Sequence, residues 1–431
     1  MKIRVLWLVS SIFPPLCKQL GIAEPTSCGW LYSAAKGVME THPDIQLGFV
    51  CPYIVNEVKH YLIEGAEYFL VPKCGIVSYS KSNISDCKMV LDAFHPDFIH
   101  IHGSETTYAA VMCEANAGSS RILVNIQGLA SGIARYADGG LSFMDKCFIT
   151  PLDFLRGTFS FRKKTIFAKR GELEKFVIQS ATDIAGRTRW DKAHVLAINP
   201  RISYYHLNET LRDSFYEGER WSYDQCDKHR IFVSNSNEPL KGTHQVIKAL
   251  PLILREFPDT KLYVIGQNVL NFGFKQYLHF TGYQMYLRAL IKKLQVEDHI
   301  HFLGTLNEQQ MREQYLKANV YVLPSSIENS SNSLSEAQIL GTPAIGSCAG
   351  GTPSMIEDGR SGYLYRYDDT EELAFNICNI FSMHRDASAF SSREVKMAMA
   401  RHDCKQNADD LIKIYDSILK QIKKCLNFSN A

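Results

Sequence analysis

The amino-acid sequence predicts an α/β chain of two doubly wound domains that face a central cleft. The chain has 431 residues, which is more than one hydrophobic core normally organises. Apolar strand-like runs alternate with helix-like segments, the pattern of parallel sheets with crossover helices. This alternation is interrupted by the polar stretch 208–229 and then begins again. Two open sheets are therefore expected, and such sheets bind ligands at the carboxyl ends of their strands.

The first domain is expected over residues 1–210, with a linker over 211–229. Ile3–Val9 is almost continuously apolar, as in a strand buried on both faces of a parallel sheet. Further strands are expected at 66–71, 98–101 and 121–126. Helices are expected from Gly29 onward, at 86–94 and at 106–116.

The second domain is expected over residues 230–403. Its expected strands are 230–233, 261–266, 300–304, 320–323 and 344–346. Its expected helices are 243–256, 283–294, 308–318 and 334–340. Residues 404–431 are expected to form a terminal helix that can cross back to the first domain.

Composition and charge favour an ordinary globular enzyme over a nucleic-acid-binding protein. Hydrophobic residues make up 45% and charged residues 21% of the chain, and the net charge is +2. None of the 12 cysteines forms a CxxC pair, so reduced structural thiols are expected. The apolar run at the N-terminus is short and contains Arg4, and no stretch of 18 apolar residues exists. The expected location is the cytoplasm.

A possible phosphate site follows the expected strand 230–233. Residues Asn235–Gly242 connect that strand to a helix, and Lys241 lies at the helix start. A cation beside helix N–H groups can bind a pyrophosphate. A lysine at a helix start is also common on protein surfaces, so a solvated lysine remains the alternative.

Two glutamates follow the expected strand 320–323. Glu328 lies in the loop and Glu336 lies eight residues later, in the expected first helical turn. Glu336 can accept hydrogen bonds from a ribose diol, and Glu328 can accept them from sugar hydroxyls. The residues between them are small and polar, among them Ser331, Asn332 and Ser333, so backbone amides can approach a ligand. The alternative is that Glu336 only complements the helix dipole and that Glu328 is a surface acid.

The stretch 327–365, IENSSNSLSEAQILGTPAIGSCAGGTPSMIEDGRSGYLY, resembles the donor-binding core of retaining glycosyltransferases of family four. The resemblance implies the GT-B architecture of two Rossmann-like domains and a nucleoside-diphosphate sugar as donor substrate, with UDP-sugars favoured over GDP-sugars. No metal or other cofactor is expected, because no cluster of acids resembles a Mg²⁺ site for phosphates.

The same resemblance assigns roles to individual residues. Lys241 and Glu328 are the implied catalytic residues, with Lys241 on the diphosphate and Glu328 on the donor sugar, while Glu336 holds the ribose. The segment His301–Leu306 is similar to the family segment whose backbone reads the base, which includes Thr305 and Leu306. Gly29 matches a glycine that approaches the diphosphate.

The first half is similar, more loosely, to bacterial enzymes of surface-polysaccharide assembly, which implies a saccharide or lipid-linked saccharide as acceptor. Two positions depart from the family: Asn235 replaces a frequent Arg, and Gln127 replaces a frequent His. Gln127 can still serve by hydrogen bonding if the leaving phosphate takes the acceptor proton. The alternatives are a catalytically silent sugar-nucleotide-binding subunit and a nucleotide-sugar epimerase of the same architecture.

Two histidines end the expected strand 98–101. His100 and His102 alternate with Ile101 and so point to one face, where contact of His102 with the acceptor is expected. Ordinary packing is the alternative, and a metal site is disfavoured because no third ligand lies nearby in sequence.

The segment Leu155–Lys175 is basic and aromatic. Such a segment suits an anionic membrane surface or a lipid-diphosphate acceptor, and a solvated helix face is the alternative. Its cations are at 156, 162, 163, 164, 169, 170 and 175, and they are interleaved with Phe159, Phe161, Ile166 and Phe167.

Overall fold

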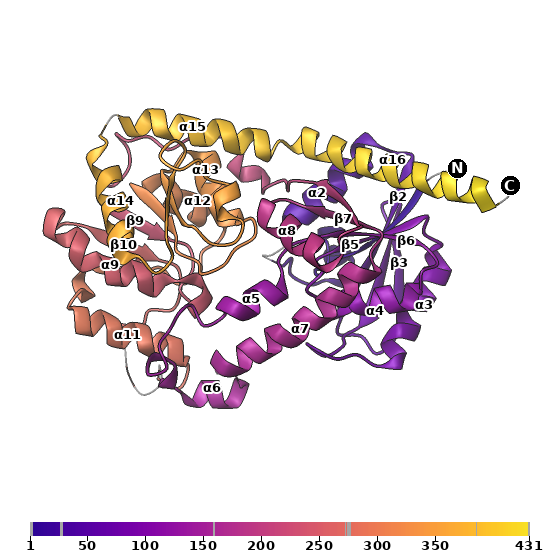
Figure 1. Cartoon of the computed structure of the whole chain (residues 1–431), viewed down its shortest axis with the longest axis horizontal. Helices are drawn as coiled ribbons and strands as arrows, with labels where there is room; N and C mark the ends of the chain where they lie inside the picture. The colour runs from indigo at the N-terminus through magenta and orange to yellow at the C-terminus, as the bar shows by residue number, and fades with distance from the viewer. Residues whose placement is uncertain are drawn as a thin grey trace. The chain divides into compact units, whose positions relative to one another are not determined.

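The computed structural model describes residues 3–25, 29–157, 160–271, 273, 277–384 and 386–429. The chain divides into two compact units (Figure 1). Unit 1 comprises residues 1–131, 168–212 and 402–431, and unit 2 comprises residues 132–167 and 213–401. Within the described part of the chain, no helix has the length and apolar character needed to span a bilayer.

Unit 1 contains an eight-stranded sheet in the order β3-β4-β2-β1-β5-β6-β7-β8. All neighbours are parallel except β3 and β4, which form an antiparallel pair. The strands are β1 Ile3–Leu8, β2 Ile45–Tyr53, β3 Lys59–Ile63, β4 Ala66–Pro72, β5 Phe98–His102, β6 Arg121–Asn125, β7 Asp183–Gly186 and β8 Ser203–His206.

Helices cover both faces of this sheet. Alternate residues of β1 enter different cores: Leu6 packs with one helix layer, and Trp7 packs with the other. The first layer contains α3 (Lys81–Phe94), α4 (Thr107–Asn116), the end of α7 (Ser160–Ser180) and α8 (Arg189–Ile198). The second contains α1 (Pro14–Leu20), α2 (Gly29–Thr41) and α16 (Cys404–Ser429).

Unit 2 contains a parallel six-stranded sheet in the order β11-β10-β9-β12-β13-β14. Its strands are β9 Arg230–Val233, β10 Lys261–Val264, β11 Ile300–Phe302, β12 Val320–Leu323, β13 Ala344–Ser347 and β14 Tyr363–Tyr365. Its longer helices are α9 Thr243–Glu256, α11 Gly282–Leu294, α12 Glu308–Lys317, α13 Asn332–Leu340, α14 Thr370–Ser382 and α15 Asp386–Arg401. Two Rossmann-like units of this kind confirm the predicted fold class.

Residues Gly132–Phe167 leave unit 1 and pack on unit 2, and we call them the docked segment. They contain the end of α5 (Ala130–Tyr136), the short helix η1 (Asp145–Cys147), α6 (Pro151–Arg156) and the start of α7. The first domain is therefore not the continuous stretch 1–210 that was expected from sequence.

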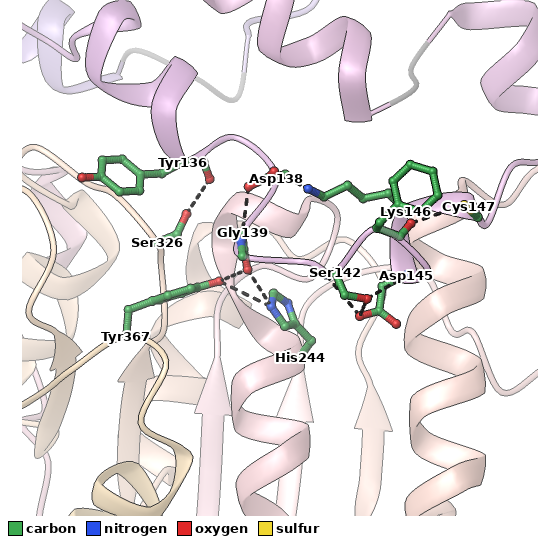
Figure 2. Close-up of polar contacts among 12 residues, drawn as sticks. Tyr136, Asp138, Gly139, Ser142, Asp145, Lys146, Cys147, His244, Ser326 and Tyr367 are labelled. Atoms are coloured by element: carbon green, nitrogen blue, oxygen red, sulfur yellow. Dashed lines mark hydrogen bonds and ion pairs between the residues drawn. The ribbon is translucent and has the colours of Figure 1, made fainter.

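Two backbone carbonyls of the docked segment are bound by side chains of the second half of the chain (Figure 2). Ser326 Oγ donates to the Tyr136 carbonyl (2.9 Å), and the Tyr367 hydroxyl donates to the Gly139 carbonyl (2.6 Å). His244 Nε2 also lies 3.0 Å from the Gly139 carbonyl. Burial lowers the pKa of His244 to about 3, so this ring is neutral and its Nε2 carries the proton that the carbonyl accepts.

Polar anchors also hold the middle and the end of the docked segment. Thr150 caps α6 and donates through Oγ1 to the Phe280 carbonyl (2.6 Å). The Asp153 carboxylate accepts from the Gly282 N–H (2.5 Å). Lys163 forms an ion pair with Glu238 at 3.3 Å. The docked segment is therefore fixed at several points by buried or half-buried hydrogen bonds.

Gly139 provides a direct test of this docking. Its φ is +60°, and a Cβ there would lie 2.2 Å from the Pro239 carbonyl oxygen. Gly140 has a similar φ of +69°, but its nearest neighbour to a Cβ is a ring atom of Tyr367 at 3.5 Å. Both alanine variants carry the left-handed backbone cost, and only Gly139→Ala adds a clash. We expect Gly139→Ala to lower the free energy of unfolding by about 1–3 kcal/mol more than Gly140→Ala. Equal denaturation midpoints for the two variants would contradict the docking.

Candidate functional site

A cavity of about 210 Å³ lies in unit 2 at the carboxyl ends of β9 and β12. Strands β9 and β12 are neighbours, so the loops that follow them meet at one edge of the sheet. Four residues expected in the donor site line this cavity: Asn235, Lys241, Glu328 and Ser333. The remaining lining residues are Val233, Ser234, Met311, Leu323, Pro324 and Ser325.

Lys241 lies at the end of a short helical turn, η3 (Pro239–Lys241), rather than in the first turn of α9. Gly242 separates the two with a φ of +68°, and a Cβ there would lie 1.6 Å from the Pro324 carbonyl oxygen. Only glycine therefore allows this loop to approach the loop after β12. Thr243 closes the loop by donating through Oγ1 to the Asn235 carbonyl (2.7 Å).

Glu328 is paired with Lys241. The Lys241 Nζ lies 2.5 Å from Glu328 Oε1, which also accepts from Ser325 Oγ at 2.9 Å. The Glu328 carboxylate raises the pKa of Lys241, so the ammonium stays charged. The Glu328 side chain is only 16% exposed, which disfavours the alternative that Glu328 is a surface acid. The structure thus brings together Lys241 and Glu328, which were expected to contact the diphosphate and the sugar of one donor molecule.

Gly350 and Gly351 contact the backbone of the loop that carries Glu328. The Gly351 N–H donates to the Glu328 carbonyl (2.8 Å). Gly350 has a φ of +59°, and a Cβ there would lie 2.0 Å from the same carbonyl oxygen. Gly350 and Gly351 thus help to place Glu328.

Glu336 occupies a different environment from Glu328. Helix α13 begins at Asn332, so Glu336 lies in its second turn and not in the first. Its carboxylate is buried and accepts from the Tyr315 hydroxyl at 3.3 Å. Tyr321 lies on β12, and its hydroxyl is 2.9 Å from Ser234 Oγ. Burial raises the pKa of Tyr321, and the charges of Glu328 and Glu336 raise it further.

The other residues expected to bind the donor do not line this cavity. Ser331 is the N-cap of α13, where its Oγ accepts from the Leu334 N–H at 3.4 Å, and Asn332 follows it. Thr305 and Leu306 lie on the loop after β11, beyond the bridge between Gly266 and Gly304, and do not line the cavity. Gly29 begins α2 in unit 1, and its surroundings fall outside the described residues.

His102 borders a second cavity, of about 490 Å³, that lies within unit 1. His102 is buried, and within the described residues neither of its ring nitrogens has a hydrogen-bond partner. Burial lowers its pKa to about 3. His100 is instead used in packing, since its Nδ1 lies 2.8 Å from the Tyr415 hydroxyl of α16. The two histidines thus have different environments, although they share one face of β5.

Gln127 is held by a buried ion pair that the sequence reasoning missed. Arg187 pairs with Glu209, and both side chains are almost fully buried. Arg187 Nη2 also donates to the Gln127 carbonyl (3.0 Å) and to its Oε1 (3.4 Å). A local signal existed, because Thr188 and Asp191 form a capping box directly after Arg187. Its partner Glu209 lies outside this capping box, and no sequence pattern around Glu209 indicated the ion pair.

Among the described residues, no three His, Cys, Asp or Glu side chains cluster as metal ligands.

The basic segment Leu155–Lys175 is divided between the two units, with the break after Phe167. Three of its cations have partners: Lys163 with Glu238, Arg170 with the Glu105 carbonyl, and Lys175 with Glu172. Phe159 and the Phe161 side chain lie outside the described residues.

The second half of the chain matches a known protein family. Residues 220–397 match the family described as "Glycosyl transferases group 1". Spore coat protein SA of Bacillus subtilis is 26% identical over 193 residues, 43% of this chain and 48% of that protein. The phosphatidyl-myo-inositol mannosyltransferase of Mycobacterium tuberculosis is 24% identical over 211 residues, 48% of this chain and 52% of that protein. The chain thus spans about half the length of these curated relatives.

Solved structures resemble the chain over nearly its whole length. Sucrose-phosphate synthase from Thermosynechococcus elongatus has a TM-score of 0.67 and 14% identity, and covers 97% of this chain and 100% of its own. HepE from Anabaena, in complex with UDP-glucose, has a TM-score of 0.64 and 13% identity, and covers 96% and 100%. Identities this low show the fold alone. Residues 220–397 are therefore a group 1 glycosyltransferase domain, in a chain with the GT-B fold.

Proposed function

We propose that this protein is a retaining glycosyltransferase that moves a sugar from a nucleoside-diphosphate sugar, with UDP-sugars favoured over GDP-sugars, to a saccharide or lipid-linked saccharide. The observation that carries the proposal is the paired Lys241 and Glu328 in the cavity at the carboxyl ends of β9 and β12. A carboxyl-end crevice is where open α/β sheets bind their ligands. Bacterial surface-polysaccharide synthesis in the cytoplasm is the proposed setting.

Lys241 is suited to the main electrostatic problem of the reaction. Negative charge grows on the diphosphate as the bond to the sugar breaks, and a preorganised cation stabilises that charge most in the transition state. The pair with Glu328 keeps the ammonium charged and in place before the donor binds. Glu328, mostly buried beside it, offers acceptor oxygens to sugar hydroxyls. The leaving phosphate oxygen takes the acceptor proton, so the proposed mechanism needs no protein base.

Unpaired polar atoms in unit 1 support the proposed acceptor class. His102, Ser104 and Asn125 are buried, and each has at least one polar side-chain atom without a hydrogen-bond partner in the part of the chain that is described. They lie at the ends of β5 and β6 or in the loop after β5. Buried polar groups without partners are costly unless a ligand or water satisfies them. A ligand rich in hydroxyl groups provides such partners.

The proposal is tested by thermal-shift measurements with a panel of UDP-sugars and GDP-sugars, because a ligand that binds the folded state stabilises it. We expect a UDP-sugar to raise the melting temperature of the wild-type protein, with or without EDTA, and to raise that of Lys241→Ala much less. No shift with any nucleotide-sugar would contradict the donor assignment, and a shift that EDTA abolishes would contradict the metal-free site.

Product analysis with the bound donor separates the alternatives. A transferase consumes the donor when an acceptor is present. Without an acceptor, it transfers the sugar to water only slowly. An epimerase of the same architecture would convert donor without acceptor. A silent subunit would bind donor and give neither transfer nor hydrolysis.

A further inference from the structure

Large apolar side chains are exposed along one short stretch of the docked segment. Such side chains scattered singly are ordinary, but a group of them marks an interaction site. The group lies between residues 143 and 155, around η1 and α6, and we call it the apolar face. Its members and their exposed fractions are Phe143 70%, Met144 75%, Phe148 38%, Ile149 56%, Phe154 77% and Leu155 83%.

Polar side chains, of which Thr150 and Asp153 are buried, hold the backbone that carries the apolar face. Ser142 Oγ donates to Asp145 Oδ2 (2.7 Å). Thr150 and Asp153 are buried and bonded to the Phe280 carbonyl and the Gly282 N–H. Polar groups inside and apolar groups outside reverse the usual arrangement of a soluble surface. Because these hydrogen bonds fix the backbone of this stretch, the exposure of its apolar side chains is a property of the folded protein.

The charges beside the apolar face are positive. Arg156, Arg162 and Lys164 are exposed. Arg162 is close to α6, since its Nη1 lies 1.6 Å from the position of a Cβ on Gly157, the residue that ends α6. The nearby acids are engaged: Asp138 pairs with Lys146 at 2.6 Å, and Asp153 is bonded and buried. Asp145 is half-buried and accepts from Ser142 Oγ, so the exposed side chains of this stretch are mostly apolar or cationic.

This combination selects one kind of partner. An anionic lipid surface offers an apolar layer beneath a layer of phosphates, which matches an apolar face with cations at its edge. A second copy of the chain would meet this surface with the same surface in a symmetric dimer, and would bring the cations of both copies together. We propose that the apolar face inserts into the headgroup region of an anionic bilayer while Arg156, Arg162 and Lys164 bind lipid phosphates.

The proposal does not depend on the donor site, and it moves membrane contact away from the part of the basic segment after Phe167. There Arg170 and Lys175 are already engaged within the protein. The inserted residues are instead aromatic and aliphatic side chains of the docked segment, which belongs to the same unit as Lys241 and Glu328.

The test is co-sedimentation of the full chain with vesicles of phosphatidylglycerol and phosphatidylcholine, compared with phosphatidylcholine alone. Phe154→Ser with Leu155→Ser is expected to reduce partitioning to anionic vesicles at least about tenfold. Arg156→Gln with Lys164→Gln is expected to reduce it about fivefold per charge at low salt, and less at high salt. The matched control is Phe375→Ser, which removes another exposed aromatic side chain, on α14 in the same unit (65% exposed); it should bind like wild type.

Circular dichroism and the donor-induced thermal shift keep the result separate from misfolding and from the donor site. Two outcomes overturn the proposal. One is wild-type protein that binds neutral and anionic vesicles equally weakly. The other is a wild-type dimer, measured by sedimentation equilibrium, that the Phe154→Ser and Leu155→Ser variant converts to a monomer without change in vesicle binding.

Discussion

Replacing Lys241 with alanine is expected to reduce glycosyl transfer at least about 10²–10³-fold, roughly 3–4 kcal/mol of transition-state stabilisation. Asn235, which lines the same cavity, supplies no charge, so Lys241 is the expected main side-chain cation on the diphosphate. The substitution also leaves the mostly buried Glu328 carboxylate without its partner, which repels the phosphates. The loss should appear in kcat as well as in donor affinity.

Lys241→Arg is the informative companion variant. It keeps the charge, but a guanidinium fork does not fill the space of an ammonium 2.5 Å from Glu328. We expect partial rescue of kcat. Circular dichroism and steady-state kinetics of both variants check this prediction. A well-folded Lys241→Ala enzyme with nearly normal turnover would refute the assignment of the donor site.

Glu328→Gln and Glu336→Ala are expected to fail in different ways. Glu328→Gln preserves shape but removes the charge that pairs with Lys241, so kcat should fall severely with folding intact. Glu336→Ala removes a buried carboxylate bonded by Tyr315, so weaker donor binding should dominate and KM should rise.

Tyr315→Phe is the control for the second variant, because it removes the hydroxyl that donates to Glu336 and leaves the carboxylate. If KM rises because Glu336 contacts the donor, Tyr315→Phe should change KM much less than Glu336→Ala. Small, equal effects of Glu328→Gln and Glu336→Ala on the kinetic constants would contradict their separate roles.

The sequence predicted most strands of the second half correctly, although each is only three or four residues long. All five strands expected in the second half are present, with ends shifted by a few residues. Among the strands that were not predicted is β2, whose sequence IQLGFVCPY contains Gly48 and Pro52. Gly48 is required there because a Cβ would lie 2.5 Å from the ring of Phe94. A residue that lowers strand propensity was thus selected by a tertiary contact.

The site was predictable to the extent that it depends on strand ends. Lys241 and Glu328 follow β9 and β12, and adjacent parallel strands bring their following loops together. The pairing of Lys241 with Glu328, the bond from Tyr315 to Glu336, and the hold of Arg187 on Gln127 depend on distant partners. Their residues carry no local pattern that names the partner. The docked segment was missed for the same reason, although Thr150 and Asp153 carry a capping box.

The path of the chain between the units sets the order in which the protein can fold during translation. The docked segment is synthesised before its partners His244, Ser326 and Tyr367 exist. The core of unit 1 is completed later still, because Tyr415 of α16 supplies the hydroxyl that is hydrogen-bonded to Trp7 and His100. Nascent chains are expected to keep the second helix layer of unit 1 incomplete until nearly all of the sequence has left the ribosome. The docked segment lacks its last partner until Tyr367 is synthesised.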